Sequence, residues 1–319
     1  MPRRCSGQIG GVATGVCKYY ACAVTDAGQV AINQDSLLVK HAVSGDIECV
    51  MAIICDGMGG LDNGELASSE VIRAFDMWFN EKAEELFKGK SIREAETAWL
   101  DILTRENLKL RNYSAENGME MGTTFTGIII LGEYLIIVHV GDSRIYHISN
   151  SISGSDICIT SEKGSSAGIR QLTEDHTFVA REVKRGKMTS EEAKKDPRQS
   201  LLLQCVGASE EVRPQIIRGK AEPGTYLLCS DGFRHEMRER EMADIFDPQF
   251  ISDKEELGKR AQDAVATVKE RGEKDNISLI LIKCDKVSSE NEGSKTEIMY
   301  NDHPNEKTCD LREGDLVRA

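Results

Sequence analysis

The chain has 319 residues and a formal net charge of −13, with hydrophobic residues at 40% and charged residues at 29%. This acidic balance argues against nucleic acid as the main partner, because a surface that follows a nucleic-acid backbone needs clustered lysine and arginine. No apolar run approaches the roughly 20 residues that cross a bilayer, and the opening segment lacks the apolar stretch of a secretory signal. We therefore expect no membrane span and a cytoplasmic location.

Three strands are predicted first, because short apolar runs are bounded there by Gly, Asp or Asn. They cover residues 19–24, 36–42 and 49–55. Two amphipathic helices are predicted next, one after Asn63 and one that opens with Ser91 and Glu94 in capping-box spacing. Both helices are expected to lie on a sheet.

The middle of the chain predicts consecutive antiparallel strands at 123–131, 133–140 and 145–148, since the connections are very short. A polar stretch over about 175–200 contains Thr189 and Glu192 in capping-box spacing and predicts a small exposed helical insertion. Strands return at 226–229 and 277–282, and a helix between them is predicted to start near Ser252 and Glu255.

This order of elements favours a layered α/β fold with antiparallel sheets over a doubly wound parallel sheet, which would need alternating crossover helices. We expect an N-terminal extension over 1–16 and one domain over 17–286, with the insertion at about 175–200 as a flap. Residues 287–319 are polar and without periodicity, which predicts a disordered tail.

Two of the predicted strands end in the same way, at Asp56-Gly57 and at Asp231-Gly232. For either pair alone a plain turn is the simpler interpretation, because Asp-Gly is a common turn sequence. Asp35 and Asp275, however, each stand just before another strand. Four aspartates at strand edges could therefore meet at one end of the sheets.

Such a cluster of acids is electrostatically costly unless a cation neutralises it. Carboxylate and carbonyl oxygens suit Mg²⁺ or Mn²⁺, whereas zinc-thiolate sites are disfavoured because the ten cysteines include no CxxC pair. The reaction for which a pair of such metal ions is most useful is the hydrolysis of phosphate esters. The residues thus predict a hydrolase acting on phosphate groups.

A series of motifs makes a family resemblance specific. The order NQDS, DGMGG, GTTFTG, GDSRIY, QLTEDH, CSDG and DNISLI resembles that of the metal-dependent (type 2C) protein phosphatases, and the match runs over about 17–284. GELAS and the stretch 184–207, the family's flap beside the active site, resemble the bacterial branch. The resemblance implies a central β-sandwich of two antiparallel sheets flanked by helices.

The resemblance also implies a division of roles at the site. Two Mg²⁺ or Mn²⁺ ions would be held, with Asp56 bridging both, Asp35 and the Gly57 carbonyl on one ion, and Asp231 and Asp275 on the other. The nucleophile would be water. Asp142 would contribute to a weaker third metal, and the alternative is a turn aspartate paired with Arg144.

The chain departs from the family pattern at two positions. Val30 stands where family members commonly have an arginine that binds the substrate phosphate, and Met58 stands where some have a histidine proposed as general acid. Another arginine is therefore expected to bind phosphate; the candidates are Arg144 and the flap residues Arg181, Arg185 and Arg198.

The sequence predicts a protein serine/threonine phosphatase that acts as a monomer on phosphorylated proteins made by a serine/threonine kinase. The alternative is a scaffold or sensor that keeps the fold and the metals and has lost turnover with the arginine at position 30. A phosphatase for small phosphorylated metabolites gains no support from the residues.

Overall fold

The computed structural model describes residues 17–58, 63–89, 92–149 and 168–286. The predicted N-terminal extension, the predicted tail and the predicted capping residue Ser91 lie outside these described residues.

The strands form two five-stranded sheets in which every paired strand is antiparallel. In spatial order, the first sheet consists of β1 (Cys17–Asp26), β10 (Ile277–Lys286), β9 (Gly224–Cys229), β6 (Arg144–Ser149) and β7 (Gly168–Gln171). The second sheet consists of β2 (Asp35–Ser44), β3 (Ile47–Asp56), β4 (Phe125–Leu131), β5 (Tyr134–Val140) and β8 (Gln215–Lys220).

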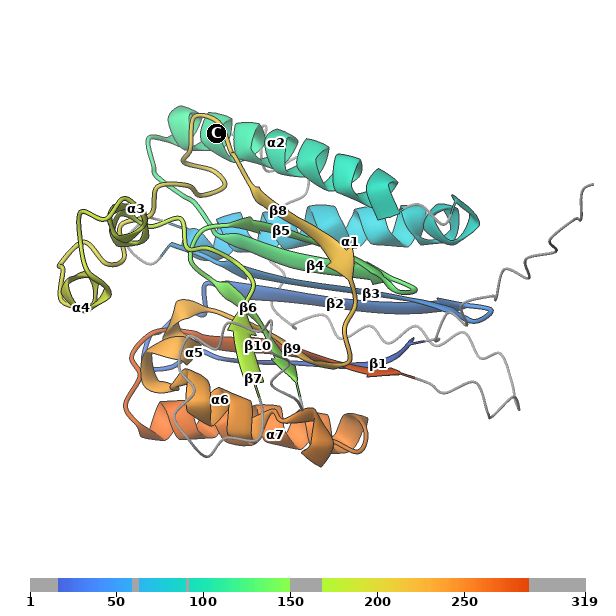
Figure 1. Ribbon diagram of the computed structural model, residues 1–319. Helices are drawn as coiled ribbons and strands as arrows, with labels where there is room; N and C mark the ends of the chain where they lie inside the picture. Colours follow the sequence, from blue (N-terminus) through green and yellow to red (C-terminus); the bar gives the residue numbers. More distant parts are fainter. Residues whose placement is uncertain (1–16, 59–62, 90–91, 150–167, 287–319) are drawn as a thin grey trace, which may run out of the picture.

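Helices cover the outer face of each sheet, so that the molecule has four layers (Figure 1). On the second sheet lie α1 (Gly64–Gly89) and α2 (Ile92–Asn117), while the first sheet is covered by α5 (Asp231–Glu236), α6 (Glu239–Ile245) and α7 (Lys254–Glu270), with a short 3-10 turn at Pro248–Phe250. This arrangement confirms the predicted sandwich of antiparallel sheets flanked by helices. Among the described helices, none has the length and apolarity required to cross a bilayer.

Three apolar cores separate the four layers, and the alternation along β3 explains why. Cys49, Met51 and Ile53 point to the core under α1 and α2. Val50, Ala52 and Ile54 point to the core between the two sheets. Successive side chains of a strand face opposite sides, so a strand in a central layer must be apolar at every position. The continuous apolar run 49–55 follows from this burial on both faces.

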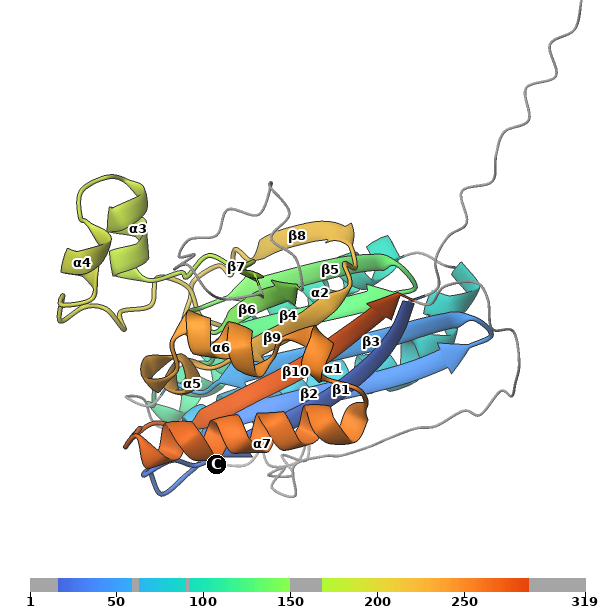
Figure 2. The same cartoon turned by 60° about the horizontal axis from the view of Figure 1, so that its bottom comes forward.

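The stretch predicted to be a small helical insertion contains two short helices, α3 (Phe178–Lys184) and α4 (Ser190–Ala193), and its role as a flap stays a prediction. The capping box at α4 forms as predicted: the Thr189 hydroxyl accepts from the Glu192 amide, and the Glu192 carboxylate accepts from the Thr189 amide. Figure 2 shows α3 and α4 projecting away from the sandwich.

Two sequence interpretations of elements were wrong in detail. The cap of α7 is Asp253, whose carboxylate accepts from the Glu256 amide at 2.9 Å, and not Ser252, whose hydroxyl donates to Asp253 instead. Two strands, β7 and β8, were missed. β7 has only four residues, and β8 is a partly exposed edge strand that lacks a continuous apolar run.

Candidate metal centre

Asp35 and Asp56 are direct cross-strand partners, at the first residue of β2 and the last residue of β3. The Asp35 side chain is buried, whereas part of the Asp56 surface is open to solvent. Like charges placed directly opposite on adjacent strands destabilise a sheet. This pair is therefore a position where a cation between the strands would stabilise the fold.

Two threonines of the GTTFTG motif hold the backbone of Asp56 in place. The Asp56 amide donates to the Thr124 hydroxyl at 2.9 Å, and its carbonyl accepts from the Thr124 amide at 2.8 Å and from the Thr123 hydroxyl at 3.0 Å. These bonds satisfy the backbone of Asp56 without using its carboxylate. The motif thus leaves the carboxylate available to a ligand.

The NQD segment is tied to the segment that carries Asp275 through one asparagine. The Asn276 side-chain oxygen accepts from the Gln34 amide at 2.9 Å, and its amide nitrogen donates to the Ala27 carbonyl at 3.1 Å. Asn33 adds a local bond, since its side-chain oxygen accepts from the Asp35 amide at 3.1 Å. Asp35 and Asp275, 240 residues apart, are thereby held at the same end of the molecule.

The glycines after Asp56 and Asp231 are required by close packing and not by a left-handed turn, since neither has a positive φ. A Cβ on Gly57 would lie 2.4 Å from the Gly64 carbonyl oxygen, and one on Gly232 would lie 2.2 Å from the Asn276 carbonyl oxygen. These are backbone atoms that cannot easily move away. The two Asp-Gly pairs are therefore places where neighbouring loops press against the strand ends.

Asp231 begins α5 at the end of β9, and Asp142 lies in the turn between β5 and β6. Asp142 is buried and contacts Arg234, whose Nη2 lies 3.4 Å from the Asp142 Oδ2. The alternative in which Asp142 pairs with Arg144 is wrong, because the Arg144 guanidinium forms a two-point bond with Asp175 at 2.8 and 2.7 Å.

Burial, and after it the mutual repulsion of these acids, raises their pKa values. Burial, followed by the charge of Asp231, raises the pKa of Asp35 to about 7 and likewise that of Asp142 to about 7. Burial and then the charge of Asp35 raise the pKa of Asp56 well above its usual range, and burial also raises that of Asp275. Each shift reports a carboxylate whose negative charge is poorly compensated by the protein itself.

The residues fit divalent cations. Both carboxylate oxygens of Asp35 are buried without a hydrogen-bond partner, although the hydroxyls of Ser230 and Ser278 lie near enough to oppose the rise of its pKa. Within the described ranges, no three Asp, Glu, His or Cys side chains form a ready-made cation site. Mg²⁺ does not require one, because it keeps several waters among its ligands when it binds.

The candidate phosphate-binding arginines have acidic or aromatic partners of their own. Arg144 also donates to the Tyr146 hydroxyl at 2.9 Å. In the flap, Arg181 and Arg198 lie over the Phe178 ring at 5.2 and 4.1 Å. Salt bridges join Arg181 and Arg185 to Glu182 and Arg198 to Asp196. Phosphate binding by any of these four stays a prediction.

Sequence reasoning missed two cationic or titratable side chains beside Asp231. Arg234 and His235 follow Asp231 by three and four residues, the spacing that places side chains on one face of a helix. His235 lies 3.7 Å from the Asp231 carboxylate and 3.5 Å from that of Glu273. The signal was present in the sequence, but the helical start at Asp231 was not predicted.

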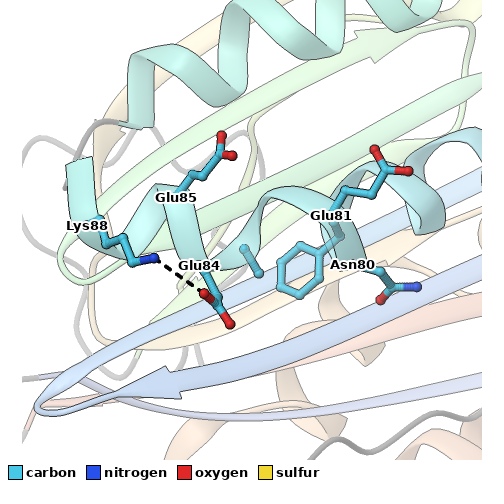
Figure 3. Close-up of a pocket in the computed structure, with 7 residues that line it drawn as sticks. Asn80, Glu81, Glu84, Glu85 and Lys88 are labelled. Carbon is cyan, nitrogen blue, oxygen red and sulfur yellow. Dashed lines mark hydrogen bonds and ion pairs between the residues drawn. The ribbon is translucent and has the colours of Figure 1, made fainter.

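A pocket on the surface lies away from these aspartates, along the second half of α1 (Figure 3). Its charged lining consists of three glutamates and Lys88, which pairs with Glu84 at 3.4 Å. It contains none of the predicted site residues.

Comparison with known proteins assigns the chain to a family. The model of the family described as protein phosphatase 2C matches residues 27–267, about three quarters of the chain. The chain belongs to the protein phosphatase 2C family. It is therefore a serine/threonine phosphatase, as the motif series predicted.

Relatives of this phosphatase agree with the assignment. The chain is 31% identical to the serine/threonine phosphatase stp of Listeria welshimeri, over 73% of this chain and 84% of that protein. A crystal structure of a bacterial serine phosphatase matches with a TM-score of 0.70 and 25% identity, covering 84% of this chain and 98% of that one. The catalytic domain of the phosphatase PstP, solved in complex with two manganese ions, matches with a TM-score of 0.58 and 27% identity over 84% and 98% of the two chains. The prediction of a metal-dependent phosphatase is confirmed.

Proposed function

We propose that this chain hydrolyses phosphoserine and phosphothreonine in proteins with two Mg²⁺ or Mn²⁺ ions at the aspartate cluster. The observation that carries the proposal is the cross-strand pair of Asp35 and Asp56, whose charges no basic side chain is seen to offset among the described contacts. Two manganese ions in the related PstP structure support the choice of cation.

The proposed ligands divide between the two sheets. Asp56 would contact both ions, Asp35 and the Gly57 carbonyl would hold one, and Asp231 and Asp275 would hold the other. When bound, the ions supply an activated water for attack on phosphorus and offset the charge of the phosphoryl oxygens. Asp142 would contribute to a weaker third site.

The protein's own part is to fix the carboxylates before substrate arrives. Thr123 and Thr124 hold the Asp56 backbone, and Asn276 holds the loops of Asp35 and Asp275 together. A set of ligands that is fixed in advance needs little reorganisation during the reaction. Asp275 is exposed and Asp35 is buried, so the cluster opens to solvent on the Asp275 side.

Substrate, partner and location complete the proposal. The substrates would be phosphorylated proteins produced by a serine/threonine kinase. The chain would act as a monomer. The seven cysteines in the described ranges are free thiols, which supports the reducing cytoplasm as the location. The catalytic domain would span 17–286, which is supported by the first strand at Cys17 and the last strand ending at Lys286.

Phosphate release from p-nitrophenyl phosphate and from a phosphothreonine peptide tests the proposal. Release is expected with Mn²⁺ or Mg²⁺ and not with EDTA, and Asp231→Asn is expected to abolish it. Asp101→Asn, an exposed aspartate on α2, is the matched control and should retain activity. Binding of the phosphopeptide without turnover at saturating Mn²⁺ would instead assign a scaffold or sensor. Activity on p-nitrophenyl phosphate alone would favour a substrate that is not a protein.

A further inference from the structure

Arg234 places a guanidinium beside the aspartate cluster. It stands in the first helical turn after Asp231, and its side chain is only 17% exposed. Its Nη2 lies 3.4 Å from Oδ2 of Asp142, on the segment between β5 and β6. A residue three positions along a helix shares the face of the first. The guanidinium therefore contacts Asp142 and stands on the same face of α5 as Asp231.

The hydrogen-bonding capacity of this guanidinium is largely unused by the protein. Its contact with Asp142 is long, since charge-assisted N–H···O bonds are usually about 2.7–2.9 Å. The Nε of Arg234 is buried and has no hydrogen-bond partner. A buried cation with unpaired donors is costly unless a second acceptor reaches it. The arrangement favours an anion with several oxygens close to Asp142 and Asp231.

Arg234 differs in this respect from the arginine candidates that the sequence suggested. The fork of Arg144 is filled by both oxygens of Asp175 and by the Tyr146 hydroxyl. Arg198 donates to both oxygens of Asp196 while it stacks on Phe178. Using either of these for substrate would first require breaking a two-point ion pair. Arg234 would give up only one long contact.

We propose that Arg234 binds the phosphate group of the substrate and so fills the role left open by Val30. The proposal rests on the phosphatase function proposed above. The planar fork of arginine offers two parallel N–H groups to two phosphate oxygens, which a lysine cannot do. Asp142 holds the guanidinium near the cluster before substrate arrives.

Binding of inorganic phosphate to the Mn²⁺-loaded protein, measured by calorimetry, tests this directly. Arg234→Gln is expected to weaken phosphate binding by about 10- to 100-fold, the loss of charge-assisted hydrogen bonds. Arg234→Lys keeps the charge and should recover only part of the loss. KM for the phosphothreonine peptide should rise most in Arg234→Gln and less in Arg234→Lys. The control is Arg218→Gln, which makes the same charge change at the pair with Glu96 on α2 and should leave phosphate affinity unchanged.

Two results would overturn the proposal. One is equal phosphate affinity in the wild type and in both Arg234 variants. The other is an additional Mn²⁺ bound by Arg234→Gln at unchanged phosphate affinity, which would mean that Arg234 only neutralises Asp142. If Arg234→Gln does not fold, the comparison of the wild type with Arg234→Lys decides by the same criterion. A wild type without turnover whose phosphate binding still depends on Arg234 would contradict the proposed function and leave this inference standing.

Discussion

Asp35 and Asp56 face each other across the β2–β3 ladder, and neither oxygen of the Asp35 carboxylate has a hydrogen-bond partner. The sheet thus brings two like charges together at its end, although their backbones are bonded normally. Such an arrangement weakens the fold in the absence of a cation and strengthens it in the presence of one. Metal binding and stability are therefore coupled through this pair.

Asp35→Asn should stabilise the metal-free protein. The substitution keeps the shape of the side chain, removes one of two opposed charges and provides an amide that can donate to Asp56. We expect the free energy of unfolding to rise by about 1–3 kcal/mol at pH 7.5 in EDTA. Urea unfolding measures it. With Mn²⁺ the wild type should be the more stable of the two proteins, because the variant has lost a metal ligand. A variant that is less stable than the wild type in EDTA would contradict this account.

The contribution of Asp35 to the stability of the metal-free protein should fall with rising pH over a defined window. Burial raises the pKa of Asp35 from 3.8 to about 7, so between these values the folded state holds a proton that the unfolded state has released. Burial lowers the pKa of His139 from 6.5 to about 3, which acts in the opposite direction over most of this window. The contribution of Asp35 is isolated by subtracting the profile of Asp35→Asn. The difference in the free energy of unfolding between Asp35→Asn and the wild type should grow as pH rises to about 7 and then level off. A difference that does not change with pH would refute this prediction.

Gly57→Ala should disrupt the strand end that carries Asp56. The new Cβ would lie 2.4 Å from the Gly64 carbonyl oxygen and 2.6 Å from that of Gln34. We expect a loss of about 1–3 kcal/mol of stability from overpacking, with a large loss of kcat, because Asp56 moves with its neighbour. Gly219→Ala in β8 is the control, since nothing lies within 4 Å of its added Cβ. Full activity of Gly57→Ala would show that the close approach is not needed.

Arg144→Ala separates a structural role from phosphate binding. The ion pair of Arg144 with Asp175 joins β6 to the segment that leads into the flap, and both side chains are mostly buried. Removing one partner of such a pair costs about 3–5 kcal/mol, and we expect that loss in thermal or urea unfolding. A phosphate-binding role would appear instead as a raised KM at nearly unchanged stability.

The sequence predicted those parts of the fold and the site that have a recognisable pattern in neighbouring residues. The aspartates at strand ends, the antiparallel strands and the capping box over Thr189 to Glu192 were readable because strand edges and caps have local signatures, whereas the sandwich of two sheets followed from the family resemblance. The partner of Asp142 was not readable, because Arg234 meets it across 92 residues of chain. The hydrogen bonds that join Thr123 and Thr124 to Asp56 were not predicted either, although the GTTFTG motif that contains both threonines stands out in the sequence.

The stoichiometry of Mn²⁺ binding, measured by calorimetry on the metal-free protein at pH 7.5, tests the central claim most directly. The account predicts two ions per chain for the wild type and loss of both in Asp56→Asn, since that carboxylate is assigned to both ions. Wild-type protein that binds no Mn²⁺, or an Asp56→Asn variant that still binds two ions with unchanged affinity, would contradict it.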